Sequence, residues 1–131
     1  MSEHTQIPVD IALHQQSKLL ELRYADDKVY QLSCEFLRVL SPSAEVRGHG
    51  PGEGTLQTGK MNVNITTIKP VGKYAIQLTF SDGHSSGIYS WEYLRELCIN
   101  QQQYWNDYRH QLREAGEHRD PDVQVVKLWN G

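Results

Sequence analysis

A chain of 131 residues can bury one hydrophobic core but not two, so we expect a single domain. Its 13 lysines and arginines against 16 aspartates and glutamates give a formal charge of −3, which lacks the basic stripe that binds nucleic acid or an anionic membrane. Two cysteines are too few for a disulfide framework, and no apolar segment resembles a signal peptide or a bilayer span, so we predict a cytoplasmic protein.

Two stretches of the chain are similar to each other, which predicts a duplicated folding unit. The matching segments are Leu20–Asp27 followed by Ser33–Leu40, and Ile76–Gly83 followed by Ser90–Leu97. One extra residue separates the two parts of the second copy. Two copies are too few for a solenoid, so we expect them to pack together in one core.

Each copy is predicted to begin with a β-hairpin. Apolar and polar residues alternate over residues 20–24 and 74–80, which is the period of a half-buried strand. Asp82-Gly83 is a favourable two-residue hairpin turn, and Asp26-Asp27 is a weaker one. Returning strands are expected over 29–32 and 86–89.

A helix is predicted after each hairpin. Ser33 and Ser90 lie where an N-cap hydroxyl would accept from the first helical turn. The second helix is predicted over about 90–115, because apolar and aromatic residues recur at spacings of three and four. Asn100 could break it, with Gln103 completing a cap. The predicted fold class is therefore α+β, an antiparallel sheet with helices built from two related hairpin–helix units.

The domain is predicted to cover residues 1–115, with its core over about 7–115 and a C-terminal tail over 116–131. Residues 41–54 are rich in Gly and Pro and predict a long surface loop, a type of segment that is often functional. A strand is expected after it over 62–68. Surfaces for a protein partner are predicted on this loop and on the tail, with candidate residues Arg47, Gly48, Gly50, Glu53 and Trp129. For Trp129 we expect docking onto the domain's own sheet, and the alternative is that it reaches the edge or groove of a partner.

Several motifs fit a structural role better than a chemical one. Residues 54–60 match the spacing of a phosphate-binding loop up to Lys60, but Met61 replaces the Ser or Thr that holds magnesium. The triplet at 118–120 is predicted to be a charged, solvated turn. Cys34 and Cys98 are predicted to be small buried hydrophobes, because both lie on apolar helix faces.

Two histidines stand in predicted loops. His49 lies in the Gly-rich segment and His84 follows the Asp82-Gly83 turn, with Glu45 or Glu53 near in sequence to the first. Imidazole and carboxylate ligands suit zinc or iron. The alternative, which the absence of standard ligand spacing favours, is that His84 faces solvent and His49 orders its loop.

Two long motifs carry a resemblance to a known family. They are Leu78–His84 running through Ile88–Arg95, and Ser41–Val46 followed by Gly48–Glu53. Over about residues 7–115 the chain resembles the gamma-butyrobetaine hydroxylase-like N-terminal domain family and is similar to its small stand-alone bacterial members.

The resemblance implies three settings for such a domain. In carnitine-pathway hydroxylases it precedes a catalytic oxygenase domain and carries a structural zinc held by three cysteines and a histidine. In some Mrp-type P-loop proteins it is fused to an iron–sulfur carrier, and in many bacteria it stands alone. His84 falls on the position of the zinc-binding histidine, while Ser41 and Ser43 follow the helix where the family has cysteines.

Three functional hypotheses follow from these observations. The first is a non-catalytic accessory module that binds zinc or iron through His49 and His84 and is linked by resemblance to oxygenase and iron–sulfur proteins. The second is a protein–protein interaction domain that uses the Gly-rich loop and the tail. The third is an enzyme in which Asp82, His84 and Glu53 act as acid–base groups, although the sequence contains no complete catalytic constellation and no oxygenase domain.

Overall fold

The computed structural model describes residues 6–48, 54–123, 126 and 128. Its elements are β1 (Asp10–His14), β2 (Leu19–Arg23), β3 (Val29–Ser33), α1 (Cys34–Val39), α2 (Ala44–Arg47), β4 (Ile65–Val71), β5 (Ala75–Phe80), β6 (Ile88–Ser90), α3 (Trp91–Ile99) and α4 (Gln101–Ala115). The predicted α+β class and the hairpin–helix units are confirmed.

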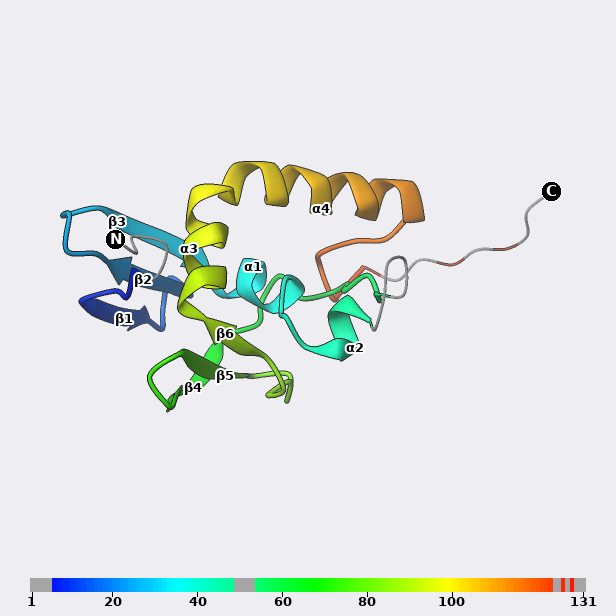
Figure 1. The fold of residues 1–131 in the computed structure, drawn as a ribbon. Helices are drawn as coiled ribbons and strands as arrows, with labels where there is room; N and C mark the ends of the chain where they lie inside the picture. Colours follow the sequence, from blue (N-terminus) through cyan, green and yellow to red (C-terminus); the bar gives the residue numbers. More distant parts are fainter. Residues whose placement is uncertain (1–5, 49–53, 124–125, 127, 129–131) are drawn as a thin grey trace.

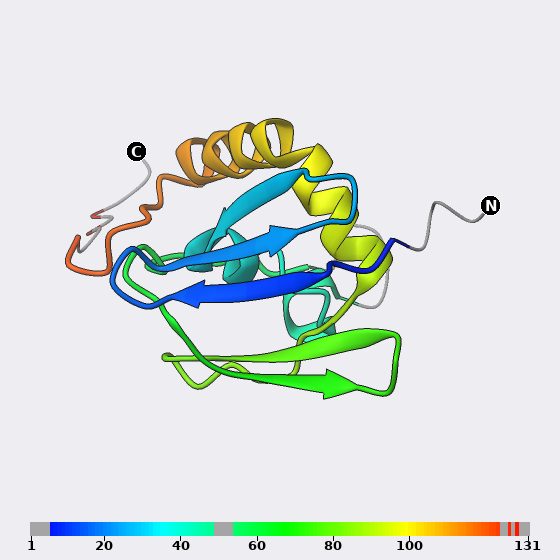
Figure 2. The ribbon, with the colours of Figure 1, turned by 90° about the vertical axis from the view of Figure 1, so that its left-hand side faces the viewer.

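The strands form two separate antiparallel sheets, with orders β1-β2-β3 and β4-β5-β6. Helix α4 runs along one side of the molecule and the β4–β6 sheet lies on the opposite side (Figures 1 and 2). Strand β1 was not predicted, and it pairs with β2 so that Ile11 is opposite Leu22. Strand β4 begins at Ile65 and continues through Pro70, later than the predicted strand.

The two copies repeat each other down to single hydrogen bonds. In the turns, the Tyr24 N–H donates to the Lys28 carbonyl over 3.0 Å, and the Phe80 N–H donates to the His84 carbonyl over 2.8 Å. Asp27 adopts a φ of 67° where the second copy has Gly83 at 92°. The unfavourable positive φ of Asp27 explains why its turn gave the weaker sequence signal.

The helix caps confirm the prediction at Ser33 and Ser90. Each hydroxyl accepts from the N–H three residues later, that of Phe36 or Tyr93, over 3.0 Å. The chain also breaks at Asn100 as predicted, separating α3 from α4. The Asn100 side chain does not cap α4; its amide donates to the Glu96 carbonyl of the preceding turn.

Most of the buried apolar residues form one continuous core between the sheets and the helices. Its fully buried members include Leu20, Leu32, Leu78, Leu94 and Leu97, so both copies contribute to it. Burial of such side chains is the main favourable term in folding, at about 1.5–3 kcal/mol each. Both cysteines are also buried and unpaired, as predicted.

Each copy sends an arginine from its helix to the turn of the other copy. Arg38 of α1 binds Asp82 in the β5–β6 turn at 2.8 Å, and Arg95 of α3 lies 3.9 Å from Asp26 in the β2–β3 turn. The Arg95 guanidinium also stacks over the Tyr24 ring at 4.4 Å. The two units are therefore held together by a reciprocal pair of interactions.

The segment after α4 is not the solvated turn that the sequence predicted. Arg119 donates through Nε and Nη2 to the two carboxylate oxygens of Glu35, both at 2.8 Å, and its guanidinium lies 5.0 Å from the centre of the Trp105 ring. Glu35 is buried on α1, and a buried carboxylate needs a paired cation. The prediction was wrong for Arg119, because nothing local in the sequence showed that Glu35 would be buried.

Replacing Asp82 by Asn should destabilise the protein by about 2–3 kcal/mol, because it leaves the buried Arg38 without its anion while keeping the turn hydrogen bond. The matched change Asp26→Asn should cost less than about 1 kcal/mol, since the Arg95 pair is longer and more exposed. Urea unfolding measures both values. Equal losses would contradict the ranking.

A chain ending at Gly116 should be less stable than the full chain by roughly 3 kcal/mol, because it loses the Arg119 partner of buried Glu35. A chain that ends at Asp122 keeps this contact and should be more stable than the chain ending at Gly116 by about 2 kcal/mol. Thermal and urea unfolding of the two truncations test this. An Arg119→Gln variant as stable as the full chain would refute the explanation.

Candidate functional site

The His84 side chain is buried among hydroxyls rather than exposed in a turn. Its Nε2 lies 2.9 Å from Ser41 Oγ and 3.4 Å from Ser43 Oγ, and only 7% of the residue is exposed. Gly87 allows this arrangement, because a Cβ there would lie 2.4 Å from Ser41 Oγ. The prediction that His84 faces solvent was wrong.

The surroundings of His84 fix its protonation state. Burial lowers the pKa of His84, and the nearby Arg38 lowers it further, whereas Glu45 and Asp82 act in the opposite direction. Partial burial would raise the pKa of Asp82, but hydrogen bonds from Lys60, the His84 N–H and Arg38 bring it down to about 2. His84 is thus a neutral imidazole, and the neighbouring Asp82 carboxylate forms ion pairs with Arg38 and Lys60.

The described part of the chain does not assemble the predicted metal site. Within it, no three His, Cys, Asp or Glu side chains are grouped closely enough to hold a metal ion. His49 and Glu53 lie outside the described residues, so a site shared by His49 and His84 stays a prediction. Ser41 also pairs with His84 as a nucleophile would with its base, but it is fully buried and offers no access to a substrate.

The segment predicted as a long loop contains the short helix α2, which is fastened to the second unit. Ser86 donates from its hydroxyl to Glu45 over 2.7 Å, and Arg47 donates from Nη1 to the Tyr93 hydroxyl over 3.0 Å. Gly54 then passes close to α2, since a Cβ at Gly54 would lie 2.6 Å from the Val46 carbonyl oxygen. These contacts fix one wall of a groove.

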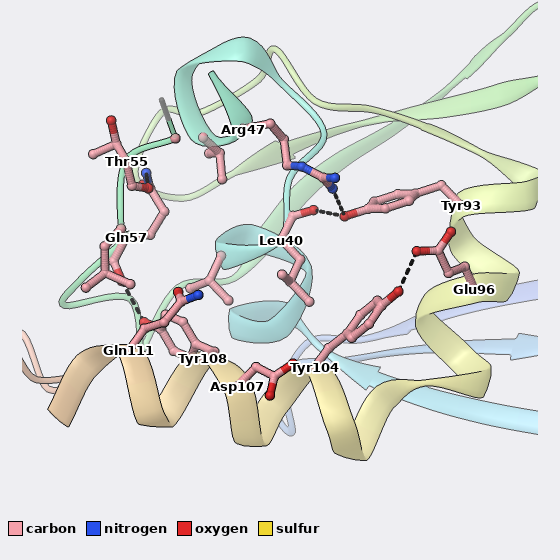
Figure 3. A pocket seen from close by; sticks show the side chains of 14 residues that line it. Leu40, Arg47, Thr55, Gln57, Tyr93, Glu96, Tyr104, Asp107, Tyr108 and Gln111 are labelled. Atoms are coloured by element: carbon pink, nitrogen blue, oxygen red, sulfur yellow. Dashed lines mark hydrogen bonds between the residues drawn. The ribbon is translucent and has the colours of Figure 1, made fainter. Parts of the chain in front are cut away.

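This groove has a volume of about 560 Å³ and is formed by the end of α1, α2, residues 54–57, α3 and α4 (Figure 3). We call it the tyrosine groove. Aliphatic side chains line its floor: Val39, Leu40, Val46 and Leu56. Its volume lies in the range of ligand-binding pockets, which combine apolar lining with a few polar groups.

The hydroxyls of three tyrosines form hydrogen bonds that connect the segments lining the tyrosine groove. The Tyr93 hydroxyl donates to the Leu40 carbonyl over 2.5 Å, the Tyr104 hydroxyl to Glu96 over 2.6 Å, and the Tyr108 hydroxyl to the Gln57 carbonyl over 2.7 Å. Burial raises the pKa of Tyr93 and Tyr108, so these hydroxyls stay neutral donors. The rings are thereby held in fixed positions around the groove.

The rim of the tyrosine groove carries polar side chains from opposite walls. Arg47 of α2 directs its guanidinium to the Tyr93 hydroxyl, whereas Glu96 of α3 and Asp107 of α4 line other parts of the groove (Figure 3). Within the described residues, the side chains of Asp107 and Gln111 take part in no hydrogen bond or ion pair. Groups of this kind are available to a ligand without breaking a contact of the fold.

Of the partner-binding residues predicted from the sequence, the structure places one in this groove. Arg47 lines it, and Gly48 ends α2 with a φ of 76°. Gly50, Glu53 and Trp129 lie outside the described residues. The α4 side of the groove was missed, because the aromatic residues of this segment were used only to predict a helix. A stripe at 104, 107, 108 and 111 was the available signal, since it mixes rings with polar groups on one helix face.

The two thiols do not provide a reactive group. Burial raises the pKa of Cys34, and it raises the pKa of Cys98 to about 11. Thiolate character is what makes cysteine a nucleophile or a metal ligand.

In the part of the chain that the structure describes, no helix is both long enough and apolar enough to cross a bilayer.

Comparison with known proteins agrees with the resemblance seen in the sequence. A family model described as gamma-butyrobetaine hydroxylase-like, N-terminal, matches residues 11–95. The chain belongs to this family. The match ends within α3, so the α4 wall of the tyrosine groove lies beyond it. No curated protein matches the chain.

Solved structures are similar to this family member beyond residues 11–95, over nearly the whole chain. One NMR solution structure is 52% identical, with a TM-score of 0.80, 95% of this chain and 98% of that chain covered. A second is 41% identical, with a TM-score of 0.77, covering 100% and 98% of the two chains. A crystal structure of a DUF971-family protein with unknown function from Acidithiobacillus ferrooxidans is 40% identical, with a TM-score of 0.61, covering 74% and 97%.

The residues at the family's implied zinc position do not fit zinc in this chain. The resemblance implies that the zinc ligands of the family occupy the positions of His84 and of residues near Ser41 and Ser43. In this chain the three side chains meet, and the two serine hydroxyls form hydrogen bonds with His84. Structural zinc takes four ligands from thiolates, imidazoles and carboxylates, and neutral hydroxyls are not among them. Within the described residues a single imidazole remains at this position, and one imidazole cannot hold the ion.

The stability of the protein should fall as the pH drops below about 6.5, the pKa of an unfolded His. The folded state holds His84 with a lowered pKa, so protonation favours the unfolded chain; the stabilisation is complete above 6.5 and is lost as the pH falls towards the lowered value. Urea midpoints between pH 7.5 and 5 measure this loss.

A His84→Gln variant should show a flatter pH dependence over this range. The matched variant His110→Gln, on the exposed face of α4, should keep the wild-type slope. A wild-type slope in His84→Gln would show that His84 is not the titrating group.

Proposed function

We propose that this protein is a non-catalytic binding module that recognises an extended segment of a partner protein in the tyrosine groove. The observation that carries the proposal is the combination of an aliphatic floor, fixed tyrosine walls and free polar groups on the rim. An extended peptide offers an apolar side chain for such a floor and main-chain amides for such a rim.

The chemistry of the lining supports a polypeptide ligand. Gln111 has both an amide donor and an acceptor, which is the pair that a peptide group requires. Tyrosine rings bury large areas at a small loss of side-chain entropy and are enriched at protein interfaces. The three rings are already immobilised by their hydroxyl contacts, so a ligand would bind a preorganised surface.

The family relationship supports the same choice. The family is described by the N-terminal region of a hydroxylase, a position in which a domain adjoins the following domain of the same chain. A partner linked to oxygenases or to iron–sulfur proteins agrees with the settings that the resemblance implies. The groove itself does not select between these partners.

Peptide display against the immobilised protein tests the proposal. Selected peptides should lose at least tenfold in affinity with Gln111→Trp, because the indole would occupy the groove from an exposed position. The matched control is Gln103→Trp, which places the same ring on an exposed position of α4 outside the groove. Peptides that bind both variants as they bind the wild type would refute the groove as the site.

A further inference from the structure

The C-terminal segment of the chain starts beside the tyrosine groove. The Gly59 N–H donates to the His118 carbonyl over 3.0 Å, and Pro121 packs where a Cβ of Gly59 would lie, with 3.5 Å between them. Two residues before Gly59, Gln57 lines the groove and accepts from Tyr108. Pro121, which comes shortly before residues 124–131 in sequence, therefore lies near the Gln57 end of the groove.

The chain bends at this point and is long enough to reach along the groove. The Asp122 N–H donates to the Asp120 carboxylate over 2.9 Å, and the Val123 N–H donates to the Asp120 carbonyl over 3.2 Å, which form a turn. Residues 124–131 can span up to about 26 Å when extended. The groove face of α4 from Tyr104 to Gln111 is only about 10 Å long.

The two described apolar side chains of this segment are exposed. Val126 and Leu128 are 67% and 73% exposed, and the sequence around them is Val125-Val126-Lys127-Leu128-Trp129. Burial of each such side chain contributes about 1.5–3 kcal/mol. The chain thus contains both an exposed apolar segment and, in the tyrosine groove, an accessible apolar surface that could bury it.

The charges of the two surfaces are complementary. Glu96 and Asp107 give the groove two carboxylates, and its one guanidinium, Arg47, is engaged with the ring and hydroxyl of Tyr93. The segment offers a single cation, Lys127, between its apolar residues. A lysine flanked by apolar side chains is the pattern that an aliphatic floor with an acidic rim would select.

We propose that residues 124–129 fold back into the tyrosine groove as an intramolecular ligand, with Lys127 paired to Asp107 and the apolar residues on the floor. The tail then regulates the groove by competing with a partner segment. This inference rests on the proposed function in one respect, that the groove is a peptide-binding site.

Fluorescence anisotropy with a labelled synthetic peptide of residues 123–131 tests the inference. The peptide should bind a chain ending at Asp122, which retains the Arg119–Glu35 contact. Its affinity should fall at least tenfold for the full chain, whose own tail occupies the groove. It should also fall at least tenfold when the shortened chain carries Asp107→Lys, but not when it carries Glu114→Lys, the same charge change on an exposed α4 position outside the groove.

Four results would overturn the inference. They are no binding to the shortened chain, equal binding to the two lysine variants, equal binding to the full chain, and a full-length dimer in light scattering that the shortened chain does not form. The last result would mean that two copies exchange their tails.

The peptides selected by display separate this inference from the proposed function. If they bind the groove of the shortened chain while the tail peptide does not, the inference fails and the proposed function stands. If only the tail peptide binds, the tail is a ligand of the groove and the partner-binding function fails.

Discussion

The six residues of α1 are all buried, and two of them, Glu35 and Arg38, carry opposite charges. A buried charge is tolerated only with a partner in good geometry. The two charges of this short helix therefore require that two distant parts of the chain pack against it. Arg38 brings the β5–β6 turn to α1 through Asp82, and Glu35 brings back the segment after α4 through Arg119. The remaining elements are arranged around these two contacts.

The tyrosine groove is a consequence of this arrangement. Its floor begins with Val39 and Leu40, at the end of α1, and α2 follows directly because Ser41 and Ser43 are fixed on His84. These hydrogen bonds thus set the direction in which the chain leaves α1. Among the described residues, Ser41, Ser43 and His84 thus have a structural role in positioning α2.

The elements of the duplicated unit could be predicted from the sequence because their signals are local. Alternating residues, a Gly-containing turn and a serine cap act within a few positions, and the structure confirms Ser33, Ser90 and the break at Asn100. Strand β1 was missed because its pairing with β2 is a contact between segments. The burial of Glu35 and His84, and with it the roles of Arg119 and Ser41, depends on tertiary packing that no local pattern encodes. The groove was missed for the same reason, since five segments contribute to it.

The reciprocal exchange of arginines has a consequence for the autonomy of the two halves. Arg38 and Asp82 belong to different copies, as do Arg95 and Asp26, so neither copy contains the counter-ion of its own helix. A nick in the connection between them would leave two fragments that each lack what the other supplies. Such fragments are suited to complementation. Each fragment alone has an arginine without its carboxylate partner, and association of the two fragments restores both ion pairs without a covalent link.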